Sequence, residues 1–398
     1  MSSSNLMIVQ GGGPTAVFNA SLAEIIAEGQ RQLSIKSVFG SRYGIRGLIH
    51  DQIVDLTNTS ATDLELLSKT PGAALGSSRH NPSEEEMRRL ARSLVSLEID
   101  LLLFLGGNGT MRGAEIISGF CASQGLNIRV VGVPKTIDND IAATNRCPGY
   151  ASAARFIATS TRELAADVRS LPQPVTILET MGRSVGWIAA ASALARTGPD
   201  SAPHLVYVPE VPFETEEFLS DLRRVVDRLG WAVVVVAEGI RHRDSKPVFE
   251  ARNPSQSDPL KRPMIGGVAQ HLATIVGERL GLRCRSEKPG LLGRSSVGCV
   301  AEQDIEDAAL VGRVGVQELV SGNTDVMVSL EALGSASRTE LVPLADAAGH
   351  ERTIPNEWLQ RGPVPVTQDF LDYVGPLVGP IGKHITEIGT AVQGIGAR

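Results

Sequence analysis

The chain has 398 residues, and its 38 Lys and Arg against 44 Asp and Glu give a formal net charge of −6. That length predicts two or three domains with a large buried core. The mild acidity gives no general attraction to nucleic acid or to anionic lipid, since both select basic surfaces. No apolar run reaches the ~18 residues of a membrane span, and the four scattered cysteines contain no C-x-x-C pair. We therefore expect a cytoplasmic protein with no nucleic-acid or membrane partner, no zinc site and no disulfide framework.

Short apolar runs that end at glycine, proline or polar residues recur along the chain and predict strands. They lie at 6–10, 101–105, 130–133, 175–178, 205–208 and 231–237. Helical patterns follow at 16–33, 83–97, 150–170 and 216–229, and Ser83-Glu84-Glu85-Glu86 predicts a capping box for the second of them. Continuous apolar strands are typical of parallel sheets, and their alternation with helices predicts a doubly wound α/β fold. Ligands in such folds bind at the carboxyl ends of the strands. The polar, proline-containing stretches 241–263 and 349–365 are predicted to be long loops.

Two glycine-rich turns follow predicted strands. Gly11-Gly12-Gly13 places bare backbone N–H groups where an anion can bind, although it has neither dinucleotide-fold nor P-loop spacing. In the second turn, residues 106–110 (GGNGT), the glycines let backbone approach a phosphate, and Asn108 offers a carbonyl oxygen to a hard cation. A tight turn without a ligand explains either motif equally well when it is taken alone.

The segment 134–140 (PKTIDND) gathers an amine, a hydroxyl and two carboxylates directly after a predicted strand. In an extended chain Asp138 and Asp140 would share a face, so that one could act as a base while the other holds magnesium. The alternative is a solvated acidic loop, but the position at a strand end favours function. Met181-Gly182-Arg183, Arg285 and Arg294 suit phosphate capture, although a surface ion pair explains any single arginine.

Together these segments resemble the phosphofructokinase family, which phosphorylates fructose 6-phosphate at its 1-hydroxyl. Five motifs in the family's order carry the resemblance: GGGPTAVFNAS, GGNGT, PKTIDND, MGRSVGW and RSEKPGLLGRS. It extends from Gly11 to about Gly315, and 373–379 is similar to the family's tail. The resemblance implies two similar doubly wound α/β domains with mostly parallel sheets and the active site in the cleft between them. We expect 1–149 plus about 294–340 to form the donor-phosphate domain, and about 150–293 plus about 341–398 to form the sugar-phosphate domain.

The resemblance also implies a role for each motif residue. Asp138 would be the general base, working with the catalytic residues Lys135, Thr136 and Asp140. The donor phosphate would contact Gly12, Arg79, Gly107, Asn108, Gly109 and Thr110. The sugar phosphate would contact Met181, Gly182, Arg183, Glu238 and Arg294, with Arg285 contributed by a neighbouring subunit of a homo-oligomer, a dimer or a tetramer. The cofactor Mg2+ would lie at Asn108 and Asp140, and with Lys135 and Arg79 it would neutralise the moving phosphate.

The sequence carries features of more than one subgroup of the family, so it leaves open both the phosphoryl donor and the sugar acceptor. Lys135 and GGGPTAV resemble pyrophosphate-using members, whereas Gly109 resembles ATP users, so pyrophosphate is favoured and ATP is the alternative. Asn108, Pro174, Leu291 and Gly293 stand where the family usually has aspartate, arginine, histidine and glutamine. Fewer phosphate contacts leave open another ketose phosphate, such as sedoheptulose 7-phosphate, or a sugar with a different anionic end. A non-catalytic regulatory subunit is the alternative of another class, which the intact Lys135, Thr136, Asp138 and Asp140 disfavour.

Overall fold

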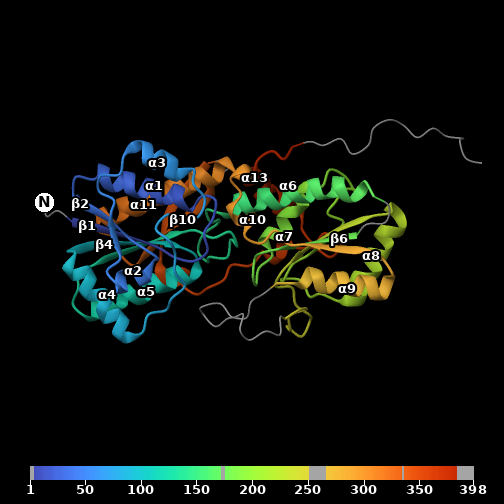
Figure 1. Ribbon diagram of the computed structural model, residues 1–398, viewed down its shortest axis with the longest axis horizontal. Helices are drawn as coiled ribbons and strands as arrows, with labels where there is room; N and C mark the ends of the chain where they lie inside the picture. The colour runs from blue at the N-terminus through green and yellow to red at the C-terminus, as the bar shows by residue number, and fades with distance from the viewer. Residues whose placement is uncertain (1–3, 172–174, 251–265, 334–335, 383–398) are drawn as a thin grey trace, which may run out of the picture.

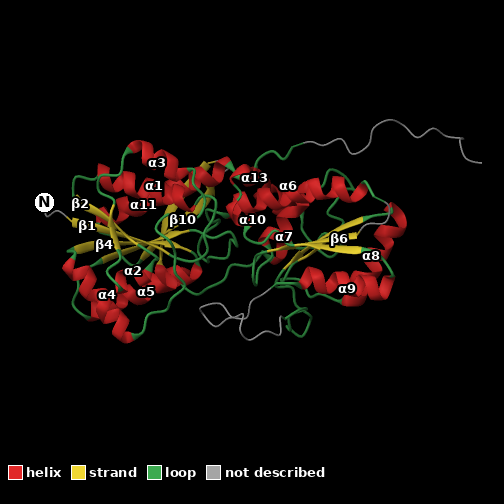
Figure 2. Ribbon diagram, in the orientation of Figure 1, coloured by secondary structure: helices red, strands yellow, loops and turns green. Residues whose placement is uncertain are grey.

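The computed structural model describes residues 4–171, 175–250, 266–333 and 336–382, which form two lobes side by side (Figure 1). Each lobe is a sheet with helices on both faces (Figure 2). The predicted fold class of two doubly wound α/β domains is thereby confirmed. Pro174 and the end of the tail from residue 383 lie outside the described residues. No helix within the described ranges is long and apolar enough to cross a bilayer.

In the described part of the chain, the first sheet has seven strands in the order β11-β10-β5-β4-β1-β2-β3. They are β1 (Ser4–Gln10), β2 (Ile35–Ser41), β3 (Ile53–Asp55), β4 (Ile99–Gly106), β5 (Arg129–Pro134), β10 (Val326–Leu333) and β11 (Ala336–Pro343). The five inner strands are parallel, and the edge strands β3 and β11 are antiparallel to their neighbours. β1 is buried at every position because helices cover both faces of the sheet.

Two hydrophobic layers enclose this sheet. On one face lie α1 (Phe18–Arg31), α3 (Ala61–Ser68) and α11 (Glu302–Ser321), and on the other lie α2 (Ile45–Ile49), α4 (Glu84–Ser96), α5 (Asn108–Ser123) and α12 (Leu344–Ala347). The predicted capping box is present at α4, where Ser83 Oγ accepts from Glu86 N and the Glu86 carboxylate accepts from Ser83 N at 2.8 Å. Three acids in its first turn also favour the helix N-terminus.

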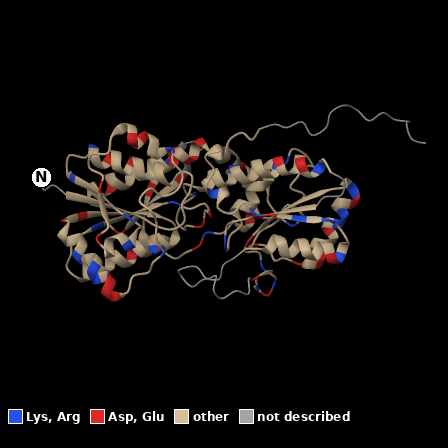
Figure 3. Ribbon diagram, in the orientation of Figure 1, with Lys and Arg blue, Asp and Glu red and all other residues tan. Residues whose placement is uncertain are grey.

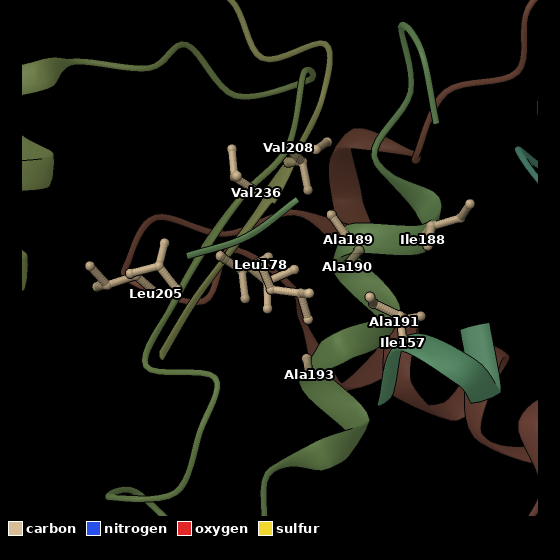
Figure 4. Packing of buried hydrophobic residues seen from close by; sticks show 14 of the residues in the cluster. Ile157, Leu178, Ile188, Ala189, Ala190, Ala191, Ala193, Leu205, Val208 and Val236 are labelled. Atoms are coloured by element: carbon tan, nitrogen blue, oxygen red, sulfur yellow. The ribbon is translucent and has the colours of Figure 1, made fainter. Parts of the chain in front are cut away.

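The second sheet, as far as it is described, has four parallel strands in the order β7-β8-β6-β9. They are β6 (Val175–Thr180), β7 (Leu205–Tyr207), β8 (Ala232–Ala237) and β9 (Cys284–Glu287). The helices of this lobe are α6 (Tyr150–Arg169), α7 (Trp187–Ala191), α8 (Thr215–Leu229), α9 (Val268–Leu280), α10 (Leu292–Ser295) and α13 (Gln368–Val378), with 3-10 turns at η1 (Ser192–Ala195), η3 (Val297–Cys299) and η4 (Asn356–Trp358). Figure 4 shows the small side chains of Ala189, Ala190 and Ala191 lying between Ile157 of α6 and the strand residues Leu178 and Val236. The alanines let α7 pack close to the sheet.

The chain passes from the first lobe to the second after β5, returns at α11, which packs on α1, and crosses again before α13, which packs on α6. β10 and β11 therefore complete the first sheet although they follow the whole second sheet in the sequence. α12 packs against α5 of the first lobe. The proposed division into 1–149 plus about 294–340 and about 150–293 plus about 341–398 stays a prediction.

A buried ion pair ties the segment between β5 and α6 to α11. Arg146 Nε and Nη2 donate to the two carboxylate oxygens of Asp307 at 2.6 and 3.2 Å, and the two side chains are 5% and 4% exposed. Because Arg146→Met leaves the Asp307 carboxylate buried without its cation, we expect the free energy of unfolding to fall by about 3–5 kcal/mol. The matched variant Lys69→Met, which removes an exposed pair with Glu65, should cost about 1 kcal/mol or less. Urea unfolding measures both, and equal costs would contradict the prediction.

Candidate active site

The three glycine-rich and charged motifs of the first lobe meet at the carboxyl edge of its sheet. β4 lies between β1 and β5, so their ends are neighbours. Gly11 N donates to Leu105 O, and Lys135 N donates to Gly106 O, both at 2.9 Å. The backbone of Lys135 is therefore bonded directly to the Gly106 turn. Figure 3 shows residues of both charges where the ends of the two sheets face each other.

Lys135 is held beneath the first glycine turn. Its side chain is almost completely buried, at 1% exposure, and Nζ donates to Gly13 O at 2.5 Å and reaches Gly11 O at 3.5 Å. The amine also lies 4.1 Å from the centre of the Phe18 ring. Burial, with the nearby charge of Arg294, lowers the pKa of Lys135 to about 7. A buried amine with this pKa can bind an anion strongly when one arrives.

Asp138 and Asp140 lie in a tight loop around Thr136. The Thr136 hydroxyl accepts from Asp138 N and donates to Asp140 Oδ1, each at 3.1 Å. Asn139 between the two acids has φ +55°, so the segment is not extended here, and the expectation of two acids sharing a strand face is wrong. The turn nonetheless brings the acids close enough to interact. Burial, then the charges of Asp140 and Glu238, raise the pKa of Asp138 to about 7, and burial also raises that of Asp140.

The second glycine turn is shorter than predicted, because α5 already begins at Asn108 and Gly107 is its N-cap residue. Asn108, Gly109 and Thr110 therefore form the first helical turn, in which Thr110 N donates to Gly107 O at 2.8 Å. A helix N-terminus of this kind is typical of a phosphate site. A Cβ on Gly11 or Gly106 would collide with the Thr110 hydroxyl, so both positions need glycine. A Cβ on Gly109 would meet open space, so the residue leaves room beside the site.

Two arginines converge on the first glycine turn. A Cβ on Gly13 would lie 2.7 Å from Nη1 of Arg294 and 3.7 Å from Nη2 of Arg79, whereas Gly12, at φ +78°, has ordinary contacts. Arg79 was expected on the donor side. Arg294, which the family resemblance assigns to the sugar phosphate, lies beside it. Burial, and to a lesser extent the repulsion from Arg79, lowers the pKa of Arg294. An anion between them would relieve that repulsion.

The residues predicted to bind the sugar phosphate follow β6 and β8 in the second lobe. Gly182 and Arg183 both have positive φ, which turns the chain back so that Arg183 N donates to the Glu238 carboxylate at 3.3 Å. Burial raises the pKa of Glu238, and the charges of both residues act on Asp138 across the lobes. Met181 lines an apolar pocket with Ile137 and Gly293. The structure thus brings these residues to the acidic loop.

Arg285 is not part of this group. It is exposed on the edge strand β9, opposite Thr176 and so five residues before Met181 on β6. β6 ends at Thr180, four residues beyond Thr176, so at ~3.3 Å per residue Arg285 lies roughly 13 Å along the sheet from that carboxyl end. Leu291, where the family usually has histidine, is 63% exposed. This exposed position fits the role at a second subunit's site that the resemblance implies for Arg285.

The residues expected at a Mg2+ site have different surroundings. The Asn108 amide is already engaged, since Oδ1 accepts from Gly349 N and Nδ2 donates to His350 O, each at 2.8 Å. Within the described ranges no three His, Cys, Asp or Glu side chains gather as a ready metal site. Mg2+ typically takes one or two carboxylates plus substrate phosphates and waters. Asp140 and Asp138, two buried acids of which Asp140 raises the pKa of Asp138, fit such an ion.

Sequence reasoning missed the residues that brace the acidic loop. Arg352 N donates to Asp140 O at 2.8 Å, and the Glu351 charge raises the pKa of Asp140. The Tyr373 hydroxyl accepts from Asn139 Nδ2 at 3.0 Å. Each contact spans more than 200 residues of sequence. The local signals were the proline-containing loop at 349–365 and the family-like tail at 373–379, and neither pointed to the acidic loop.

Comparison with known proteins is consistent with this geometry. The phosphofructokinase family model matches residues 5–308. The pyrophosphate–fructose 6-phosphate 1-phosphotransferase of Rhodospirillum rubrum is 35% identical over 380 residues, which are 94% of each chain. The sulfofructose kinase of Alkalicoccus urumqiensis is 32% identical, with 89% of this chain and 91% of that protein covered. The crystal structure of pyrophosphate-dependent phosphofructokinase from Nitrosospira multiformis matches with a TM-score of 0.86 and 30% identity, over 97% of this chain and 95% of that one. This chain therefore belongs to the phosphofructokinase family.

Proposed function

We propose that this protein transfers a phosphoryl group from pyrophosphate to the 1-hydroxyl of fructose 6-phosphate, with Mg2+ as cofactor. The observation that carries the proposal is the assembly of Lys135, Thr136, Asp138 and Asp140 against both glycine turns at one sheet edge. The relative from Rhodospirillum rubrum is named for this reaction. The predicted cytoplasmic location stays a prediction.

The residues divide the chemistry between them. Asp138, whose pKa of about 7 suits proton transfer near neutral pH, would accept the proton as the sugar oxygen attacks the transferred phosphorus. The new O–P bond forms while the bond to the leaving phosphate breaks. Lys135, Arg79, Arg294 and the first turn of α5 would stabilise the negative charge of the two phosphates. Mg2+, held by Asp140 with the donor phosphate, would neutralise further charge.

Pyrophosphate is favoured over ATP because Lys135 fills the floor of the donor site beneath Gly13. The open space at Gly109 is the feature that keeps ATP as the second candidate. Purified protein assayed with Mg2+ and fructose 6-phosphate should turn over with pyrophosphate at least about tenfold faster, in kcat/KM, than with ATP. The reverse order would assign the donor to ATP.

The acceptor needs a separate test, because Leu291 removes one expected phosphate contact and one relative is named a sulfofructose kinase. We expect fructose 6-phosphate to give the highest kcat/KM in a panel with sedoheptulose 7-phosphate and sulfofructose. Preference for either of the others would keep the chemistry and change the substrate. Failure with every donor and acceptor, alongside measurable binding, would favour a regulatory subunit.

We also propose a homo-oligomer, a dimer or a tetramer, because the exposed Arg285 lies before the carboxyl edge where the other predicted site residues of its chain meet. In such an assembly the exposed Arg285 of one subunit would contact the acceptor phosphate of another. Light scattering of the purified protein measures the subunit number.

A further inference from the structure

The segment Gly349–Ile354, here called the strap, lies across the ends of both sheets. It meets, in order, the N-terminus of α5, the acidic loop, the turn after β6 and the turn after β7. Arg352 N donates to Asp140 O at 2.8 Å, and Glu351 forms an antiparallel bridge with Ile141. The strap therefore adds backbone pairing directly to the loop that carries both acids.

On the acceptor side the strap is fixed at two further points. The Ser184 hydroxyl donates to the Glu351 carboxylate at 2.7 Å, one residue after the Met181-Gly182-Arg183 turn. One oxygen of Glu210 accepts from both Ile354 N and Gly186 N, at 3.2 and 3.0 Å. The strap thus links the acceptor turn to the acidic loop.

Arg352 anchors the middle of the strap in the aromatic core of the second lobe. Its guanidinium lies 4.3 Å from the centre of the Trp187 ring, and Trp187 Nε1 donates to Arg352 O at 3.1 Å. A cation over the face of an indole ring, with a hydrogen bond to the same residue's backbone, fixes both ends of Arg352.

On the donor side the side chain of Asn108 holds the strap. Its amide makes one bond in each direction, accepting from Gly349 N and donating to His350 O, both at 2.8 Å. Only a side-chain amide can satisfy both, because a carboxylate accepts from the N–H but repels the carbonyl oxygen. Asn108 is also the first residue of α5, where an aspartate would be favoured by the helix dipole. The contacts with the strap, and not the position in the helix, therefore explain why residue 108 is an asparagine.

We infer that Asn108 is a positioning residue, which clamps the strap across the donor turn and so holds the acidic loop in its catalytic geometry. The kinetic consequence rests on the proposed function, whereas the clamp itself is a property of the fold. If Asn108 instead bound Mg2+, Asn108→Asp would have the opposite effect. The carboxylate would then strengthen Mg2+ binding.

The test is Asn108→Asp, with Asn108→Ala as a second variant and the exposed Asn58→Asp as the control for the added charge. Hydrogen–deuterium exchange measures the amides of Gly349 and Arg352, which should exchange at least about tenfold faster in both Asn108 variants and normally in the control. Since this readout needs no activity, it separates a failure of the clamp from a failure of the proposed function.

In steady-state assays with pyrophosphate, both Asn108 variants should lower kcat by about 10–100-fold while the KM for Mg2+ changes less than about threefold. Unchanged exchange of the strap would overturn the inference. So would an Asn108→Asp enzyme with a lower KM for Mg2+ and undiminished kcat, because that result assigns Asn108 to the metal.

Discussion

Asp138→Asn lowers kcat by about 10²–10⁴-fold, the usual contribution of a positioned general base, with little change in KM. The amide keeps the volume of the carboxylate but cannot accept the proton of the sugar hydroxyl. The variant should remain folded, since burial and the charges of Asp140 and Glu238 oppose the ionised form of Asp138. Its thermal unfolding midpoint should therefore equal or exceed that of the parent protein. Initial rates at saturating substrates and a thermal scan measure the two quantities.

The control is Asp55→Asn, which neutralises an exposed acid on the edge strand β3 and should leave kcat unchanged. A matching loss in both variants would point to net charge instead of proton transfer. Full activity of Asp138→Asn would remove Asp138 as the base and leave Asp140 as the remaining acid of the loop.

The position of the site followed from the sequence because each motif directly follows an apolar strand. In a doubly wound sheet the carboxyl ends of parallel strands share one edge, so Gly12, Gly107 and Lys135 had to meet once their strands were adjacent. The same rule placed Met181 and Glu238 at the edge of the second sheet, where β6 and β8 are neighbours. Local sequence and sheet topology were therefore sufficient to predict where the site lies.

Contacts between distant segments were not predictable in this way. Nothing near Asn108 in the sequence indicates that its amide binds the backbone of residues 349 and 350, and nothing near Asn139 indicates that Tyr373 stabilises it. The position of Arg294 beside Gly13 depends on how the two lobes pack. The left-handed conformation of Asn139 is a local feature, but asparagine only permits it and does not require it. Periodicity and spacing in a sequence indicate helices and strands. Contacts such as those of Asn108 and Arg294 depend on how these helices and strands pack together.

Lys135→Met should lower kcat with pyrophosphate by about 10²–10³-fold, the cost of removing one donor from a charged transition state. Methionine has nearly the length of lysine and keeps the space beneath Gly13 filled, so the change removes charge and hydrogen bonding but not packing. Burial already disfavours the charged amine, whose pKa is about 7, so we expect the unfolding midpoint to shift by less than about 4 °C. A large loss of stability would instead make Lys135 structural.

Lys135→Gly separates the charge of this side chain from its volume. Glycine removes the amine together with the methylene stem that occupies the floor of the donor site, at 1% exposure in the parent protein. Pyrophosphate turnover should fall at least as far as in Lys135→Met, because both variants lack the cation. ATP turnover should rise in Lys135→Gly only, since that variant alone removes the volume that Lys135 fills in the donor site while Gly109 already leaves open space. Parallel assays with both donors decide the matter, and equal ATP turnover in the two variants would show that charge, not volume, selects the donor.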